Sequence, residues 1–161
     1  MNCPSCGAPM QLKQGMDSFQ CAYCQSIYLP EKNDDGVRVL DEAVGLACPT
    51  CRAQLMQAAL ANTRLVYCTA CRGMLITMPA FQTLVDEWVP TTDGATVPPA
   101  ADSNDLRRKI PCPRCHRTMD AHFYAGPGNV ILDSCEDCLL IWLDYGELKR
   151  IAQARKAGEM Q

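Results

Sequence analysis

The feature that most constrains this chain is the arrangement of its cysteines, which occur only as C-x-x-C pairs. There are 12 cysteines in six pairs, and the pairs fall into three sets with 14, 16 and 19 residues between the two pairs of a set. These intervals lie within or near the range of four-cysteine metal sites. We therefore expect three metal sites with four thiolate ligands each: Cys3, Cys6, Cys21 and Cys24; Cys48, Cys51, Cys68 and Cys71; Cys112, Cys115, Cys135 and Cys138.

The N-terminus and the apolar runs indicate the compartment. The opening residues, MNCPSCGAPMQLKQG, contain no basic segment followed by an apolar one, so no signal peptide is predicted. No apolar run approaches the roughly 20 residues that a membrane span requires. We expect a cytoplasmic protein, and in that reducing compartment clustered cysteines bind metal rather than form disulfides.

An internal repeat accompanies the cysteines. Each set begins with C-P-x-C, and after its last cysteine each set continues into a short apolar run, Ile27–Leu29, Met74–Ile76 or Ile141–Leu143. Between the two pairs there is room for a hairpin, most clearly where two β-prone runs flank the AGPG turn in the third set. Each unit is too small to bury a large core, so metal and strand must share the work of stabilising it.

Helices are predicted after the second and third units. In the second, Thr77 and Pro79 mark a helix start, and the apolar residues that follow recur at helical spacing. In the third, Asp144 and Glu147 have the spacing of a capping box. The first unit stops at Pro30, and no helix is predicted there.

Residues 112–152 resemble the bacterial zinc-ribbon family named for its likeness to the ribbon of transcription factor IIB. The shared residues are the third cysteine set with Pro113, then Ile141-Trp142-Leu143-Asp144 and Gly146-Glu147-Leu148. Residues 48–85 are similar to a diverged copy, and residues 3–30 to a generic ribbon. The resemblance implies a zinc-binding, non-enzymatic fold. It does not imply transcription initiation, because fold does not determine function.

The predicted fold class is a small metal-bound α+β protein of three tandem zinc-ribbon (rubredoxin-like) units. The last two units are each followed by a short helix. The expected domains are ribbon 1 at 1–30, an acidic connector at 31–45, ribbon 2 with its helix at 46–89, a flexible linker at 90–111 and ribbon 3 with its helix at 112–161. The Pro-rich and Ala-rich linker leads us to expect that ribbon 3 moves separately.

Several alternatives compete for the cysteines. Zinc is the expected ion, three per chain, although tetrahedral thiolate sites also accept iron. Cys112 to His116 matches a haem-attachment pattern, but a second C-x-x-C in register favours a metal site. As spare ligands, His116 and His122 are disfavoured because four-thiolate sites are closed, and surface or hairpin-packing roles are expected. Thioredoxin-like dithiol chemistry is disfavoured because no βαβ pattern is present, which leaves a redox-sensitive zinc switch as an alternative function.

An enzyme is not expected, because catalytic zinc needs an open coordination position and four thiolates leave none. We expect neither a small-molecule substrate nor a membrane partner. The formal charge of −3 argues against a strongly basic nucleic-acid binder. Local basic clusters still allow a nucleic-acid or RNA-polymerase contact; these are Arg107-Arg108-Lys109 with Arg114 and Arg117, and Lys149-Arg150 with Arg155-Lys156.

The expected function is that of a protein-interaction scaffold with an unidentified protein partner. The apolar run after Cys138 is the predicted contact surface, centred on Leu139, Leu140, Trp142 and Tyr145. In a strand, Leu140 and Trp142 would lie on one face and Ile141 and Leu143 on the other. The first of these faces is predicted either to bind the partner or to be covered by the rest of the protein.

Overall fold

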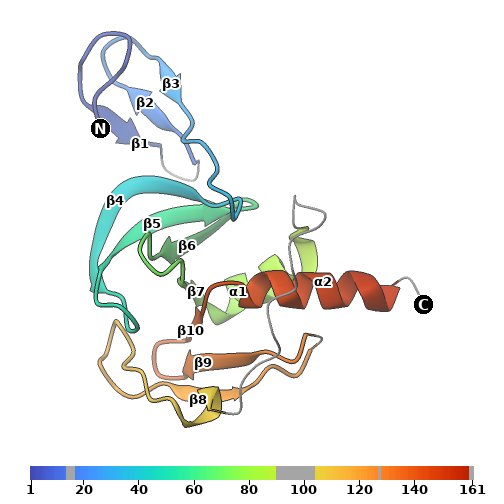
Figure 1. Cartoon of the computed structure of the whole chain (residues 1–161). Coiled ribbons are helices and arrows are strands. Elements are labelled where there is room, and N and C mark those ends of the chain that lie inside the picture. Colours follow the sequence, from blue (N-terminus) through green and yellow to red (C-terminus); the bar gives the residue numbers. More distant parts are fainter. Residues whose placement is uncertain (14–16, 90–103, 127, 160–161) are drawn as a thin grey trace.

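The computed structural model describes residues 1–13, 17–89, 104–126 and 128–159 and shows an α+β protein with two unequal parts (Figure 1). The smaller part is ribbon 1, a three-stranded antiparallel sheet of β1 (Met10–Leu12), β2 (Phe19–Cys21) and β3 (Ile27–Tyr28). It projects from the rest of the protein (Figure 1). As predicted, its described residues form no helix.

The larger part is a seven-stranded antiparallel sheet that contains both remaining ribbons. Its strands, in spatial order, are β4 (Arg38–Ala47), β5 (Gln54–Leu60), β6 (Thr63–Tyr67), β7 (Met74–Thr77), β10 (Leu140–Leu143), β9 (Ile131–Cys135) and β8 (Asp120–Phe123). Ribbon 2 supplies β5 to β7, ribbon 3 supplies β8 to β10, and the two ribbons meet where β7 pairs with β10. The prediction that ribbon 3 moves separately is therefore wrong, because one hydrogen-bonded sheet runs through both ribbons.

The junction between β7 and β10 has approximate twofold symmetry. Leu75 and Trp142 each stand four residues after the last cysteine of their set, and they lie directly opposite each other in the antiparallel register. In the next pair, Ile76 is the fifth residue after the last cysteine of its set, and Ile141 is the third residue after the last cysteine of the other set. Ribbons 2 and 3 thus pair through the same strand of the repeat, like two subunits of a dimer within one chain.

The two faces of β10 are buried in two different cores, and the predicted alternation is confirmed. Ile141 and Leu143 pack with apolar residues of α1 (Met78–Glu87) and α2 (Glu147–Glu159), two helices on the same side of the sheet (Figure 1). Leu140 and Trp142 pack on the opposite side, with the buried cysteines of ribbons 2 and 3. The run after Cys138 is therefore core on both faces.

Both helices begin close to the predicted residues. The Thr77 hydroxyl oxygen accepts a hydrogen bond from the Ala80 backbone N–H at 3.4 Å and caps α1. In α2 the Glu147 carboxylate accepts from the Asp144 backbone N–H at 2.8 Å, which is one half of the predicted capping box. Arg155 of α2 donates to the Val85 carbonyl at the end of α1, where a cation complements the helix dipole. Among the described residues, no helix has the length and apolar character needed to cross a membrane.

The described residues of both segments between the ribbons are part of the folded structure. Strand β4 begins inside the expected acidic connector, pairs with β5, and sends Leu40 into the core of ribbon 1. Of the expected flexible linker, residues 90–103 lie outside the described residues. The rest is ordered: Asp105–Arg107 is a short 3-10 helix and Ile110 is buried beside Cys112. This second half of the linker packs on ribbon 3 because it carries a buried side chain.

Candidate metal centres

The twelve cysteines form three clusters, and these are the three sets that the spacing predicts. Within each cluster the four sulfur atoms all lie within 4.8 Å of one another. Sulfur pairs such as Cys3 with Cys24 and Cys6 with Cys21 are 3.5 Å apart, far beyond the roughly 2.05 Å of a disulfide bond. All twelve are free cysteines. Four convergent thiols at this spacing fit an ion held tetrahedrally at about 2.3 Å from each sulfur.

The backbone repeats one turn at the cysteine pairs. After the second cysteine of every pair stands a residue with positive φ: Gly7, Gln25, Arg52, Arg72, His116 and Leu139. In five of the six turns, its N–H donates to the carbonyl of the first cysteine, as in His116 to Cys112 at 2.9 Å. This turn aims both thiols of a pair at one point. The sequence suggests it only at Gly7, because glycine alone adopts positive φ without strain.

Neither histidine of ribbon 3 is a metal ligand in the clusters of the described residues. His116 is exposed at the positive-φ position of its turn, and His122 lies on the edge strand β8 within 3.5 Å of the Ser134 hydroxyl. Neither belongs to a cluster, and the clusters found among the described residues contain cysteines only. Cys112 and Cys115 of the haem-like pattern belong to the third cluster.

Exposure differs between the three clusters. The first cysteine of every pair is buried in all three. The second cysteines differ: Cys6 and Cys24 are both exposed, Cys51 is exposed while Cys71 is half-buried, and both are half-buried in the third cluster. Solvent access to the metal ligands therefore falls from ribbon 1 to ribbon 3.

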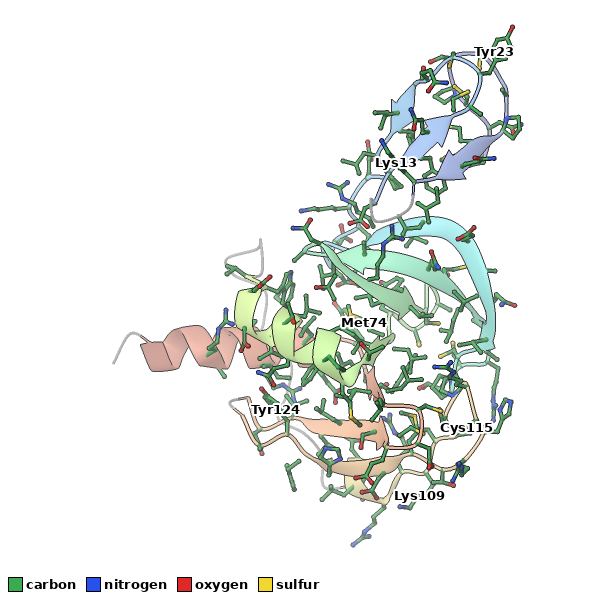
Figure 2. The ribbon with its side chains drawn as sticks, turned by 180° about the vertical axis from the view of Figure 1, so that it is seen from behind. Lys13, Tyr23, Met74, Lys109, Cys115 and Tyr124 are labelled. Carbon is green, nitrogen blue, oxygen red and sulfur yellow. The ribbon has the colours of Figure 1, made fainter. Side chains whose placement is uncertain are left out.

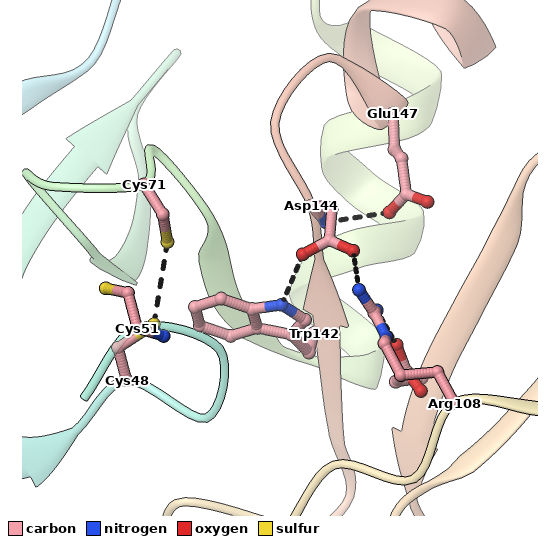
Figure 3. Close-up of polar contacts among 8 residues, drawn as sticks. Cys48, Cys51, Cys71, Arg108, Trp142, Asp144 and Glu147 are labelled. Carbon is pink, nitrogen blue, oxygen red and sulfur yellow. Dashed lines mark hydrogen bonds and ion pairs between the residues drawn. The ribbon is translucent and has the colours of Figure 1, made fainter. Parts of the chain in front are cut away.

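Trp142 lies between the second and third clusters and joins their cores. Its ring covers Gly73, where an added Cβ would stand 2.2 Å from the indole Cζ2. Its indole N–H donates to the Asp144 carboxylate at 2.9 Å (Figure 3). Arg108 donates to the same carboxylate (Figure 3). It also donates to Asp133, which is 1% exposed. One tryptophan and one arginine thus connect ribbon 2, ribbon 3 and the segment before ribbon 3.

The surroundings of these carboxylates change their acidity. Burial raises the pKa of Asp133, and the neighbouring Arg108 partly offsets this effect. Burial also raises the pKa of Glu147 to about 8, although the Asp144 N–H that it accepts acts in the opposite direction. The sequence offered Asp144 and Glu147 only as a helix cap. The Asp144 side chain instead holds the tryptophan and the arginine.

A second polar network joins ribbon 2 to the acidic connector. Arg72, beside Cys71, donates through Nε to Asp35 at 2.7 Å, and the Tyr67 hydroxyl donates to the same carboxylate at 2.9 Å. Burial raises the pKa of Tyr67 to about 12, and the bond to Asp35 adds to this. The Tyr145 ring of ribbon 3 lies over the Arg72 guanidinium, 4.2 Å from its centroid, a favourable cation–π contact. Sequence reasoning missed this network because its members are far apart along the chain.

The predicted contact surface in ribbon 3 is wrong for its two central residues. Trp142 is fully buried and Leu140 is 7% exposed, because both pack in the shared core of ribbons 2 and 3. Leu139 and Tyr145 are exposed, but Leu139 accepts the Met78 N–H through its carbonyl and Tyr145 covers Arg72. Leu140 and Trp142 thus form part of an internal junction, and the four residues do not make one surface.

Comparison with known families identifies the last ribbon. Residues 111–154 match the family of TFIIB-type zinc ribbons, described as "Transcription factor zinc-finger". The match covers the third cluster, β8 to β10 and the start of α2, so ribbon 3 carries this family's fold. Neither the comparison with curated proteins nor the comparison with solved structures gave a match. The three clusters and the α+β fold together define three tandem zinc ribbons.

Proposed function

We propose that this chain is a non-enzymatic protein that binds three structural zinc ions and acts as a protein-interaction scaffold. Each cluster offers four thiolates, which complete a tetrahedral shell and leave no position for a water or a substrate. Zinc is favoured over iron because tandem four-cysteine ribbons are a common structural zinc site. Metal analysis of protein purified without added metal should give three zinc ions per chain. An iron content equal to zinc would contradict this assignment.

The single observation that carries the scaffold role is where the exposed apolar residues lie. Half of the exposed large hydrophobic residues in the described chain belong to ribbon 1: Met1, Tyr23, Ile27 and Leu29. Tyr23 is 83% exposed and points outward at the far end of ribbon 1 (Figure 2). Exposed tyrosine and aliphatic side chains on a projecting module favour contact with a protein partner.

The alternative, a nucleic-acid or RNA-polymerase contact through basic patches, has less support. Several cations of the predicted clusters are engaged inside the protein: Arg108 pairs with Asp133 and Asp144, and Arg155 binds the end of α1. Arg117 pairs with Asp137 at 2.9 Å. Phosphate binding depends on cations that are available to neutralise the backbone. Paired cations offer little of that charge.

The test is an affinity capture from the native organism with the full zinc-loaded chain, performed with and without nuclease. The scaffold role requires a protein that is retained after nuclease treatment and lost when the metal is removed. Recovery of nucleic acid without protein would overturn the scaffold role and favour the alternative. Phe123→Ser is the control variant for this capture, because it changes an exposed aromatic residue on ribbon 3 and leaves the apolar residues of ribbon 1 in place.

A further inference from the structure

We infer that one face of ribbon 1 is the docking site for an amphipathic helix of the partner. The inference rests on the proposed interaction function and specifies the element that ribbon 1 contacts. The three ribbons are compared by counting from the last cysteine of each set, Cys24, Cys71 and Cys138. Equivalent positions then show which surface is covered in two ribbons and bare in the third.

The third and fifth positions after the last cysteine are apolar in every ribbon. They are buried in ribbons 2 and 3, as Met74 and Ile76 and as Ile141 and Leu143. Their equivalents in ribbon 1 are Ile27 and Leu29, which are 65% and 50% exposed. The fourth position, by contrast, faces the cysteine side in all three ribbons, and Tyr28 packs there against the core of ribbon 1. Ribbon 1 therefore has its cysteine-side core, whereas no described residue covers Ile27 and Leu29 on the other face as the helices cover their equivalents.

In ribbons 2 and 3 this face is covered by a helix with a fixed apolar pattern. The buried residues of α1 stand at positions 10, 13 and 14 after Cys71, and those of α2 at the same positions after Cys138. These triplets are Phe81, Leu84 and Val85 in α1 and Leu148, Ile151 and Ala152 in α2. The spacing i, i+3, i+4 forms one apolar stripe on a helix. The repeat thus shows what kind of element fits over this strand.

The described residues of ribbon 1 do not supply such a helix. After Pro30 the chain turns away, with Arg38 donating to the Pro30 carbonyl, and it continues as β4. The rest of the bare face is polar: Gln11 lies opposite Gln20, Gln20 lies opposite Ile27 across the sheet, and Lys13 lines the same hollow as the two glutamines. We therefore expect a partner helix with an apolar i, i+3, i+4 triplet over Ile27 and Leu29 and polar residues toward the glutamines.

A strand from a second copy of this chain fits less well. The edge of β3 corresponds to the edges that pair between β7 and β10, so strand addition is the main competing arrangement. The pairing of β7 with β10 includes Thr77, which is the sixth residue after Cys71. The sixth position in ribbon 1 is Pro30, which has no N–H to donate and blocks pairing at an edge.

Paired substitutions first test the equivalence of the positions. Ile27→Ser and Leu29→Ser should leave the zinc content and the melting temperature of the full chain unchanged, because both side chains are exposed. Ile141→Ser, the equivalent of Ile27 in ribbon 3, should lower the melting temperature strongly because Ile141 is buried in the core that contains both helices. If Ile27→Ser also unfolds ribbon 1, the face is already covered and the inference is wrong.

A photo-crosslinking residue at position 27 of the full chain, in the native organism, then identifies what lies over the face. The crosslinked partner segment is synthesised as a peptide and titrated into the zinc-loaded protein. We expect the peptide to gain helicity on binding, and Ile27→Ser to weaken binding about tenfold or more, as for a residue at an interface hot spot. Phe123→Ser should leave the affinity within about twofold, since it lies on another ribbon.

Three results overturn the inference, and they differ from failure of the proposed function. A crosslink to a second copy of this chain indicates strand addition. A peptide that binds without gaining helicity, or with an affinity that Ile27→Ser does not change, indicates another mode or site. Each of these leaves the scaffold role intact. Crosslinks to nucleic acid alone contradict both the inference and the proposed function.

Discussion

Ribbon 1 and the joined pair of ribbons 2 and 3 are built on the same cysteine turns but stabilise them differently. Ribbon 1 encloses its cluster with a small core of Cys3, Met10, Phe19 and Cys21, completed by Leu40 of β4. In the pair, two clusters share one core, and the opposite face of the sheet carries two helices. The difference shows that the metal turn determines only local geometry. The strand that follows the last cysteine decides whether a ribbon stands alone or joins another.

The largest effect that should distinguish the two parts is the loss of one metal ligand from each. Cys135→Ser should unfold both ribbons 2 and 3, because β10 pairs with β7 and the cysteines of both clusters lie in one core. Cys21→Ser should unfold ribbon 1 and leave the pair folded. A structural zinc contributes roughly 10–16 kcal/mol of apparent binding energy in finger peptides, comparable with the roughly 5–15 kcal/mol stability of a whole domain.

Amide NMR spectra and zinc content measure this difference directly. For Cys21→Ser, signals from residues 46–89 and 112–152 should keep their dispersion, and zinc should fall by one equivalent. For Cys135→Ser, signals from both segments should collapse. If Cys21→Ser also abolished the dispersion of the pair, the two parts would form one cooperative unit and the comparison would fail.

An intermediate effect is expected where ribbon 2 accommodates the tryptophan of ribbon 3. Gly73→Ala places a methyl group 2.2 Å from the indole Cζ2 of Trp142, and overpacking of this kind costs about 1–3 kcal/mol. Trp142→Leu removes the obstacle, so adding Gly73→Ala to that variant should cost much less. Ser26→Ala, at the equivalent position of ribbon 1, is the matched control and should leave the pair unchanged.

Urea unfolding of the four proteins in this double-mutant cycle gives the coupling free energy. We expect a coupling of about 1 kcal/mol or more between Gly73 and Trp142, as for residues in direct contact. Additive effects within about 0.3 kcal/mol would mean that the two ribbons do not meet at this point. That result would remove the packing basis for treating ribbons 2 and 3 as a pair.

These contacts also show how much of the protein the sequence could predict. The clusters, the apolar strand after each set and both helices follow from local spacing, as Thr77 and the apolar triplets illustrate. The pairing of β7 with β10 does not, because Gly73 and Trp142 are 69 positions apart and complement each other only once the strands are aligned. Strand partners are a non-local choice, and no periodicity within either ribbon encodes it.

Charged residues were the other limit of the sequence analysis. In the sequence, Arg108 belongs to a basic cluster, whereas in the structure it forms ion pairs with Asp133 and Asp144 of ribbon 3. Asp35 counted as part of an acidic connector, whereas it binds Arg72 and Tyr67. A cation and an acid that are distant in sequence look like two solvated charges until the fold brings them together.

A further expected effect is a pH dependence of stability that belongs to the pair alone. Burial raises the pKa of Glu147 from 4.5 to about 8, so between these values the folded state keeps a proton that the unfolded state has lost. The contribution of Glu147 to the free energy of unfolding must then fall as the pH rises through this window and level off above about pH 8.

Ribbon 1 has no buried carboxyl among its described residues and should show no such contribution. Glu147→Gln, which keeps an acceptor for the Asp144 N–H, should remove this contribution. Urea unfolding of zinc-loaded protein between about pH 6.5 and pH 9, where thiolates hold the metal, measures the slope of stability with pH. An equal slope in wild type and variant would show that Glu147 is already ionised in the folded pair.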